Sequence, residues 1–168
     1  MGTYIKARLG HVFRFGNKCG FGVHSPRMYE MITEVLAPRR RKVENVPVPE
    51  GRMRRRTRAM YRLVRRLADY ERPERLYYAD ASALDFIETG RTELLPLEET
   101  FVRTSGYWLV FESGNRRLVL MREIHGTNRR LWEKARTGAE VRVDMMWYGL
   151  LIFDPALQKG NYRVLLKK

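Results

Sequence analysis

The chain has 168 residues, with 33 Lys and Arg against 19 Asp and Glu, a formal net charge of +14 at pH 7 and a hydrophobic share of 44%. This length and this hydrophobic share allow one folded domain with a core and exclude a disordered chain. No stretch is apolar for long enough to span a membrane, and the N-terminus lacks the apolar core of a secretory signal. The single cysteine, Cys19, excludes an internal disulfide and favours a reducing compartment, so we expect a cytoplasmic protein.

The excess of positive charge is the part of the composition that bears most directly on function. A field of this sign attracts polyanions such as RNA, DNA or an anionic membrane surface. A basic surface that only keeps the chain soluble is the alternative, because positive charge permits nucleic-acid binding without specifying it.

The first third of the chain predicts one well-marked helix between two segments of different character. Residues 1–19 mix aromatic and basic side chains, which fits a short amphipathic arm that lies on a partner or packs on its own domain. Ser25 can cap a helix whose first residue is Pro26, and apolar residues follow at helical spacing until Pro38. Residues 38–51 contain three prolines and the basic cluster 39–42, so we expect a solvated connector there.

Residues 52–71 predict the clearest helix, and its two faces differ sharply. Apolar residues recur at helical spacing on one side. The opposite side carries six arginines: Arg54, Arg55, Arg58, Arg62, Arg65 and Arg66. Like charges at this density repel one another unless acidic groups or a partner offset them, and guanidinium groups match phosphate oxygens. This arginine face is the expected nucleic-acid-binding surface, and a solvated face of a core-packed helix is the alternative.

Short apolar runs after Pro73 predict a sheet. We expect strands over 75–79, 107–111, 117–121, 141–146 and 162–166, with a further strand over 92–97 that Pro96 interrupts. Residues 148–153 are expected to continue the strand over 141–146 after a bend at Gly149. Residues 112–116 join two of these strands as a hairpin or a short loop. A helix is expected over 128–138, capped by Thr127 or Asn128 and ended by Gly138.

Three motifs occur in the order in which one bacterial family carries them. They are Gly-Val-His-Ser-Pro at 22–26, Phe-Glu-Ser-Gly-Asn-Arg at 111–116 and Arg-Glu-Ile-His-Gly-Thr at 122–127. They resemble the signature His-Gly-Val-His-Ser-Pro and two later segments of a family of class I S-adenosylmethionine (SAM)-dependent methyltransferases. The resemblance implies an α/β fold, a reduced class I methyltransferase-like (Rossmann-like) sheet flanked by helices. It divides the chain into an N-terminal arm, helix and linker over 1–51 and a shortened methyltransferase-like domain over 52–168.

The chain departs from that family where the cofactor binds. The turn from Asp80 to Leu84 has no glycine, although glycine lets the backbone approach a cofactor closely. Ser113 and Arg122 stand where the family has aspartates. Residues 85–106 are too few for a central strand with its crossover helix. These departures favour a methyltransferase-like protein that has lost catalysis, a pseudoenzyme whose basic surface binds RNA or a protein partner.

A working SAM-dependent methyltransferase with a compact site is the alternative. The resemblance then implies that Asp80 and Ser82 contact the cofactor, SAM. It also implies that Ser113, Glu123 and His125 line the catalytic acceptor site, so that these side chains converge at the ends of adjacent strands. A chain that has lost catalysis is expected to need no cofactor.

Two further expectations concern metals and partners. His11, His24 and His125 lack the spacing of a zinc site, so we expect no metal. A shortened sheet would expose an edge strand, which could pair with a second copy as a homodimer or with another protein.

Overall fold

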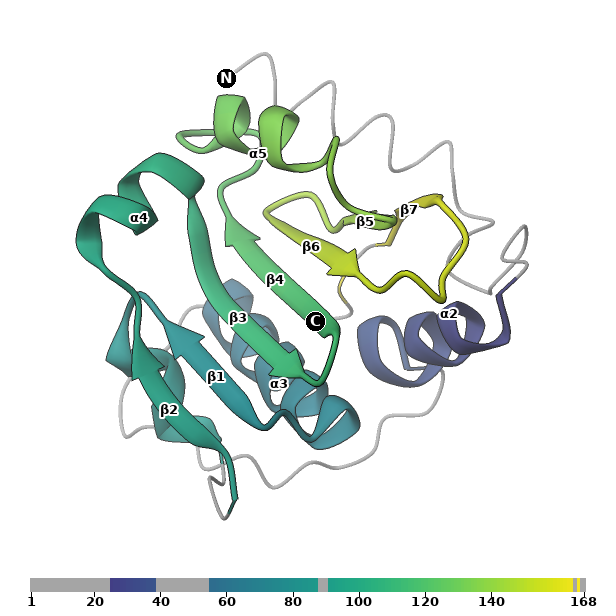
Figure 1. Ribbon diagram of the computed structural model, residues 1–168, viewed down its shortest axis with the longest axis horizontal. Helices are drawn as coiled ribbons and strands as arrows, with labels where there is room; N and C mark the ends of the chain where they lie inside the picture. The colour runs from purple at the N-terminus through teal and green to yellow at the C-terminus, as the bar shows by residue number, and fades with distance from the viewer. Residues whose placement is uncertain (1–24, 39–54, 88–90, 165, 167–168) are drawn as a thin grey trace.

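The computed structural model describes residues 25–38, 55–87, 91–164 and 166, which Figure 1 draws as a coloured ribbon. Within these ranges the fold is mixed α/β, with a seven-stranded open sheet and four α-helices, and this confirms the predicted α/β class. Several expectations fall outside the described residues: the arm at 1–19 with His11 and Cys19, the motif residues 22–24 with His24, and the basic cluster 39–42.

The predicted helix start at Ser25 is confirmed. The Ser25 Oγ accepts from the backbone N–H of Met28 at 3.4 Å, and Pro26 occupies the first helical turn. This helix, α2 (Pro26–Glu30), continues as the π-helical segment η2 (Met31–Leu36). Met28 and Leu36 are fully buried, so the apolar spacing read from the sequence marks the face that packs on the core.

The second predicted helix is α3 (Arg55–Glu71), and its apolar face is buried as expected. Leu63, Val64 and Leu67 have no exposed surface. They share one apolar cluster with Phe111 and with α2 and η2, so α3 is held by core packing rather than by helix propensity.

The strands lie close to the predicted positions. Their bounds are β1 (Arg75–Tyr78), β2 (Glu93–Pro96), β3 (Tyr107–Ser113), β4 (Arg116–Arg122), β5 (Val141–Asp144), β6 (Tyr148–Phe153) and β7 (Gly160–Arg163). The order across the sheet is β2-β1-β3-β4-β6-β5-β7. β1 pairs with β2 and β5 with β7 in parallel, whereas all other neighbours are antiparallel.

Five strands therefore run in one direction, and β3 and β6 run in the other. We call the end of the sheet where β1, β2, β4, β5 and β7 finish the carboxyl edge, and the opposite end the amino edge. The loops after β1 and β4 meet at the carboxyl edge, together with the starts of β3 and β6.

β3 and β4 form a hairpin, which is one of the two connections expected for residues 112–116. Ser113 pairs with Arg116, and Gly114, with φ of 54°, and Asn115 make the turn. A hairpin makes its two strands antiparallel, whereas a helical crossover would have made them parallel. The short connection therefore decides the direction of β3 and the edge at which its last residue lies.

The two faces of the sheet are covered unequally, as Figure 1 shows with α3 behind the strands, and α2 packs into the same apolar cluster as α3. The covered side, the helix face, carries the larger apolar cluster. The other side, the open face, carries a smaller cluster around Val119, Leu151 and Trp132. Trp132 belongs to α5 (Arg129–Ala135), and α4 (Glu99–Ser105) adds no buried residue. Both short helices lie near the carboxyl edge, so no described helix covers the open face nearer the amino edge.

The helix predicted over 128–138 is shorter than expected, and Asn128, one of the two predicted caps, occupies the N-cap position. Asn128 precedes α5, but its side chain makes no capping bond to the helix. Its Nδ2 donates instead to the carbonyl oxygen of Arg122 at 3.0 Å. The last helical residue is Ala135, three positions before Gly138. Asn128 thus ties α5 to the end of β4.

Candidate functional site

Asp80 lies at the carboxyl edge directly after β1 and has two partners. Its Oδ1 accepts from the backbone N–H of Ser82 at 3.0 Å and so caps the short 3-10 helix η3 (Ala81–Phe86). Its Oδ2 lies 3.8 Å from Nη1 of Arg122, the last residue of β4. The resemblance assigns Asp80 and Ser82 to the cofactor. In the structure Asp80 pairs with an arginine, and the backbone N–H of Ser82 donates to Asp80.

Arg122 reaches Asp80 across the start of β3, because β3 separates β1 from β4 in the sheet. Its guanidinium carbon lies 5.1 Å from the centroid of the Trp108 ring, within the range of a cation–π contact. The side chains of Asp80 and Arg122 are each 47% exposed, so solvent weakens their attraction. The aromatic ring and the carboxylate together hold the guanidinium over the point where β1, β3 and β4 meet.

His125 and Asp144 form the second pair at the carboxyl edge. Nε2 of His125 lies 2.9 Å from Oδ2 of Asp144, and both side chains are mostly buried. Oδ1 of Asp144 accepts from the backbone N–H of Met146 at 2.8 Å, which fixes the carboxylate. Glu123, two residues before His125, has φ of 54°, and its backbone N–H donates to the Trp147 carbonyl at 2.7 Å. Sequence reasoning did not single out Asp144, because only the pairing of β5 with β6 brings it to this loop.

Ser113 lies at the amino edge, at the far end of β3 from His125 and Glu123. β3 begins at Tyr107, which pairs with Met121 near the carboxyl edge, and ends at Ser113 in the hairpin. Ser113 is six residues after Tyr107, and six residues of a strand span about 20 Å. Of the residues predicted to converge, the structure brings Asp80, Glu123 and His125 to one edge of the sheet and leaves Ser113 at the other.

The described residues hold no metal-binding cluster: no group of three or more His, Cys, Asp or Glu side chains is arranged to hold a metal ion there. The same residues contain no helix with the length and apolarity that a bilayer crossing requires.

The arginine face of α3 divides into engaged and solvent-facing members. Nε of Arg66 donates to the Val35 carbonyl at 2.7 Å, so this arginine ties α3 to the end of η2. Nε of Arg65 lies 3.9 Å from Asp69 one turn later. Within the described ranges no acidic side chain pairs with Arg58 or Arg62. Arg54 lies outside the described residues, and Arg55 is placed only by its backbone as the first residue of α3.

A buried ion cluster that the sequence did not reveal lies at the amino edge. The Glu71 side chain, at the end of α3, is 1% exposed and has Nη2 of Arg116 at 2.5 Å and Nη2 of Arg27 at 3.6 Å. Arg27 also reaches Asp154 at 3.3 Å. Burial raises the pKa of the Glu71 carboxyl above its usual range, and the nearby Arg27 opposes that shift. The cluster joins α2, α3, β4 and the end of β6.

No family model, no curated protein and no solved structure matches the chain.

Proposed function

We propose that this chain is a non-catalytic, methyltransferase-like module that binds RNA through the solvent-facing arginines of α3. The pair of Arg122 with Asp80 carries the first half of the proposal. The resemblance implies that the loop after β1, where Asp80 lies, contacts the cofactor. Asp80 lies at the carboxyl edge, and Nη1 of Arg122 lies 3.8 Å from its carboxylate.

The residues at this edge do not fit SAM. The methyl donor carries a positively charged sulfonium, and the Arg122 guanidinium would repel it at short range. The turn from 80 to 84 contains no glycine that would let the backbone approach a ligand, and the Asp80 side chain caps η3 instead. These features support loss of the cofactor, and we derive no methyl-transfer step for this chain.

Arg58 and Arg62 support the RNA-binding half of the proposal. They lie one helical turn apart on α3, whose opposite side is buried against the sheet, so both project from the same surface. Two guanidinium groups at this spacing, with no acidic partner among the described residues, match adjacent phosphate groups of a flexible strand. The net charge of +14 supplies the long-range attraction.

The test is fluorescence anisotropy with a single-stranded RNA oligonucleotide over a series of salt concentrations. The variant R58E/R62E removes the proposed contacts, and R129E/R130E makes the same change in net charge on α5, which packs against the other face of the sheet. We expect the first variant to bind at least about tenfold more weakly than the second. For a single strand, losing two phosphate contacts should lower the salt slope by about 1.4. Equal losses in both variants would mean that only the overall charge matters and would contradict the proposal.

One observation favours the alternative of a working methyltransferase. A carboxylate that orients a histidine, as Asp144 does for His125, is the arrangement of a general base. The distance of Ser113 from this pair counts against the compact acceptor site that the resemblance implied. Binding of SAM separates the two proposals, since only a working enzyme needs it.

A further inference from the structure

The open face of the sheet carries a row of alternating charges across four adjacent strands. Strand register places Glu93 beside Arg75, Arg75 beside Glu112, and Glu112 beside Arg117. We call these four residues the charge row. Phe153 of β6 pairs with Arg117 and closes the row, with the guanidinium carbon 5.1 Å from the ring centroid.

Side-chain contacts hold the charge row in a defined arrangement. Nε of Arg75 lies 3.2 Å from Glu93, and Nη1 of Arg75 lies 3.6 Å from Glu112. The Tyr77 hydroxyl donates to Glu112 at 3.2 Å. The Arg75 and Glu93 side chains are still 54% and 60% exposed, so their free sides remain accessible to another molecule.

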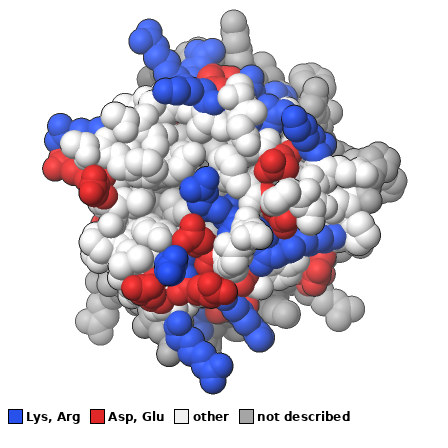
Figure 2. All heavy atoms as spheres, in the orientation of Figure 1, with Lys and Arg blue, Asp and Glu red and all other residues white. Residues whose placement is uncertain are grey.

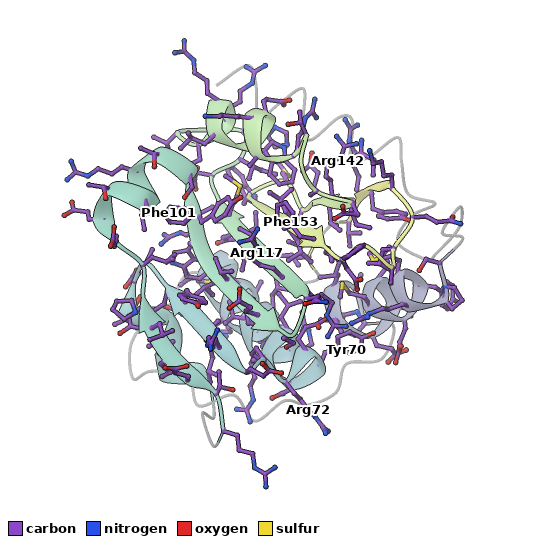
Figure 3. All side chains as sticks on the ribbon, viewed as in Figure 1. Tyr70, Arg72, Phe101, Arg117, Arg142 and Phe153 are labelled. Atoms are coloured by element: carbon purple, nitrogen blue, oxygen red, sulfur yellow. The ribbon has the colours of Figure 1, made fainter. Side chains whose placement is uncertain are left out.

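The described helices leave this part of the sheet uncovered. Figure 3 shows Arg117 and Phe153 near the middle of the open face, with no ribbon in front of them. Figure 2 shows Lys and Arg side chains directly beside Asp and Glu side chains over the same region. The face is therefore a mixed-charge surface and not part of the basic excess.

The order of signs makes the charge row complementary to itself. A two-fold axis that runs parallel to the strands, between β1 and β3, would place Glu93 opposite Arg117 of a second copy and Arg75 opposite its Glu112. Every charge then meets its opposite. A two-fold axis along the row would instead bring each residue against its own copy, with like charges facing. Only the first arrangement places opposite charges against each other. Two-fold symmetric contacts are the commonest in protein assemblies.

We propose that two copies of this chain associate face to face through the charge row. With two positive and two negative members, the row gives a polyanion no net attraction, so a second copy fits it better than RNA does. The edge strands suit association less well: β2 and β7 have four residues each, and β2 contains Pro96, which has no N–H to donate. The arginines of α3 lie on the helix face and stay accessible in such a dimer, so this inference stands apart from the proposed RNA binding.

The test is sedimentation equilibrium of the full chain over a concentration series at low and high salt. We expect a monomer–dimer equilibrium that salt weakens. The variant Glu112→Arg places like charges opposite each other at both symmetry-related contacts and should raise the dissociation constant roughly 100-fold. The control Glu34→Arg makes the same charge change at an exposed position of η2, on the helix face, and should leave the constant unchanged.

A fourfold exchange of signs keeps the test decisive if Glu112→Arg disturbs the fold. The variant E93R/R75E/E112R/R117E restores alternation both within one copy and between copies, so it should dimerise again. A wild-type chain that stays monomeric at every concentration would overturn the proposal. So would a dimer that Glu112→Arg leaves intact, or a folded sign-exchanged variant that stays monomeric.

Discussion

Removing one partner of the buried Glu71–Arg116 pair should be among the most destabilising single changes in the chain. Arg116→Met would leave the Glu71 carboxylate, 1% exposed, with Arg27 at 3.6 Å as its remaining cation. Breaking a buried ion pair in this way typically costs about 3–5 kcal/mol of unfolding free energy, because a charge stays buried without compensation. A domain of this size has only about 5–15 kcal/mol in total.

The unfolding free energy lost in Arg116→Met should depend on pH, because the ionisation of Glu71 depends on pH. Burial raises the pKa of Glu71 in the folded state above the ordinary value of a glutamate carboxyl. A carboxyl group with a raised folded pKa stabilises the fold below its unfolded pKa, and that contribution is lost as the pH rises through the folded value. Arg116→Met removes a cation from the carboxylate and should widen this window. We therefore expect a larger loss at pH 7 than near pH 4.5.

Urea denaturation followed by circular dichroism at both pH values measures the effect. The double variant E71Q/R116M removes the charge together with its partner and should recover part of the loss. Arg103→Met is the control, since Arg103 and Glu99 form an exposed pair on α4 and should contribute less than about 1 kcal/mol. A loss below about 1 kcal/mol for Arg116→Met, equal at both pH values, would refute the reasoning.

Two further predictions concern packing and ionisation. Gly149→Ala should lower the free energy of unfolding by about 2–3 kcal/mol, measured by urea denaturation, because an added Cβ would lie 2.7 Å from Cε3 of the Trp132 ring. The loss should shrink in a Trp132→Leu background, and an equal loss in both backgrounds would show that the ring is not the obstacle. Spectrophotometric titration should show a pKa of about 12 for Tyr70, raised by burial and then by Glu30, whose Oε2 accepts from its hydroxyl at 3.2 Å. Glu30→Gln should lower that pKa, and a titration that does not change would contradict the assignment.

Local signals in the sequence were sufficient for the elements that depend on neighbouring residues. Ser25 followed by Pro26 predicts the start of α2, and apolar spacing predicts the buried side of α3. The run from 148 to 153 predicts the extent of β6, but the expectation that it continues the strand over 141–146 is wrong, because β6 turns back and pairs antiparallel with β5. Each of these depends on contacts or turn chemistry within a few positions of the chain.

Features that depend on strand direction could not be read in advance. The hairpin reverses β3, and this reversal separates Ser113 from His125 although the motifs suggested that they meet. Asp144 and Glu71 gain their roles from partners that are distant in sequence. Arg66, one of the arginines expected to bind nucleic acid, donates through Nε to the Val35 carbonyl, because the end of η2 packs beside α3. Charge and spacing alone do not distinguish these outcomes.

Calorimetric titration of the full chain with SAM, and with its demethylated product, tests the central claim most directly. The pairing of Arg122 with Asp80 predicts no saturable heat, and thermal unfolding should not shift when either compound is added. Saturable binding at micromolar concentration would contradict the account, because it would mean that the carboxyl edge still accepts the cofactor despite the arginine.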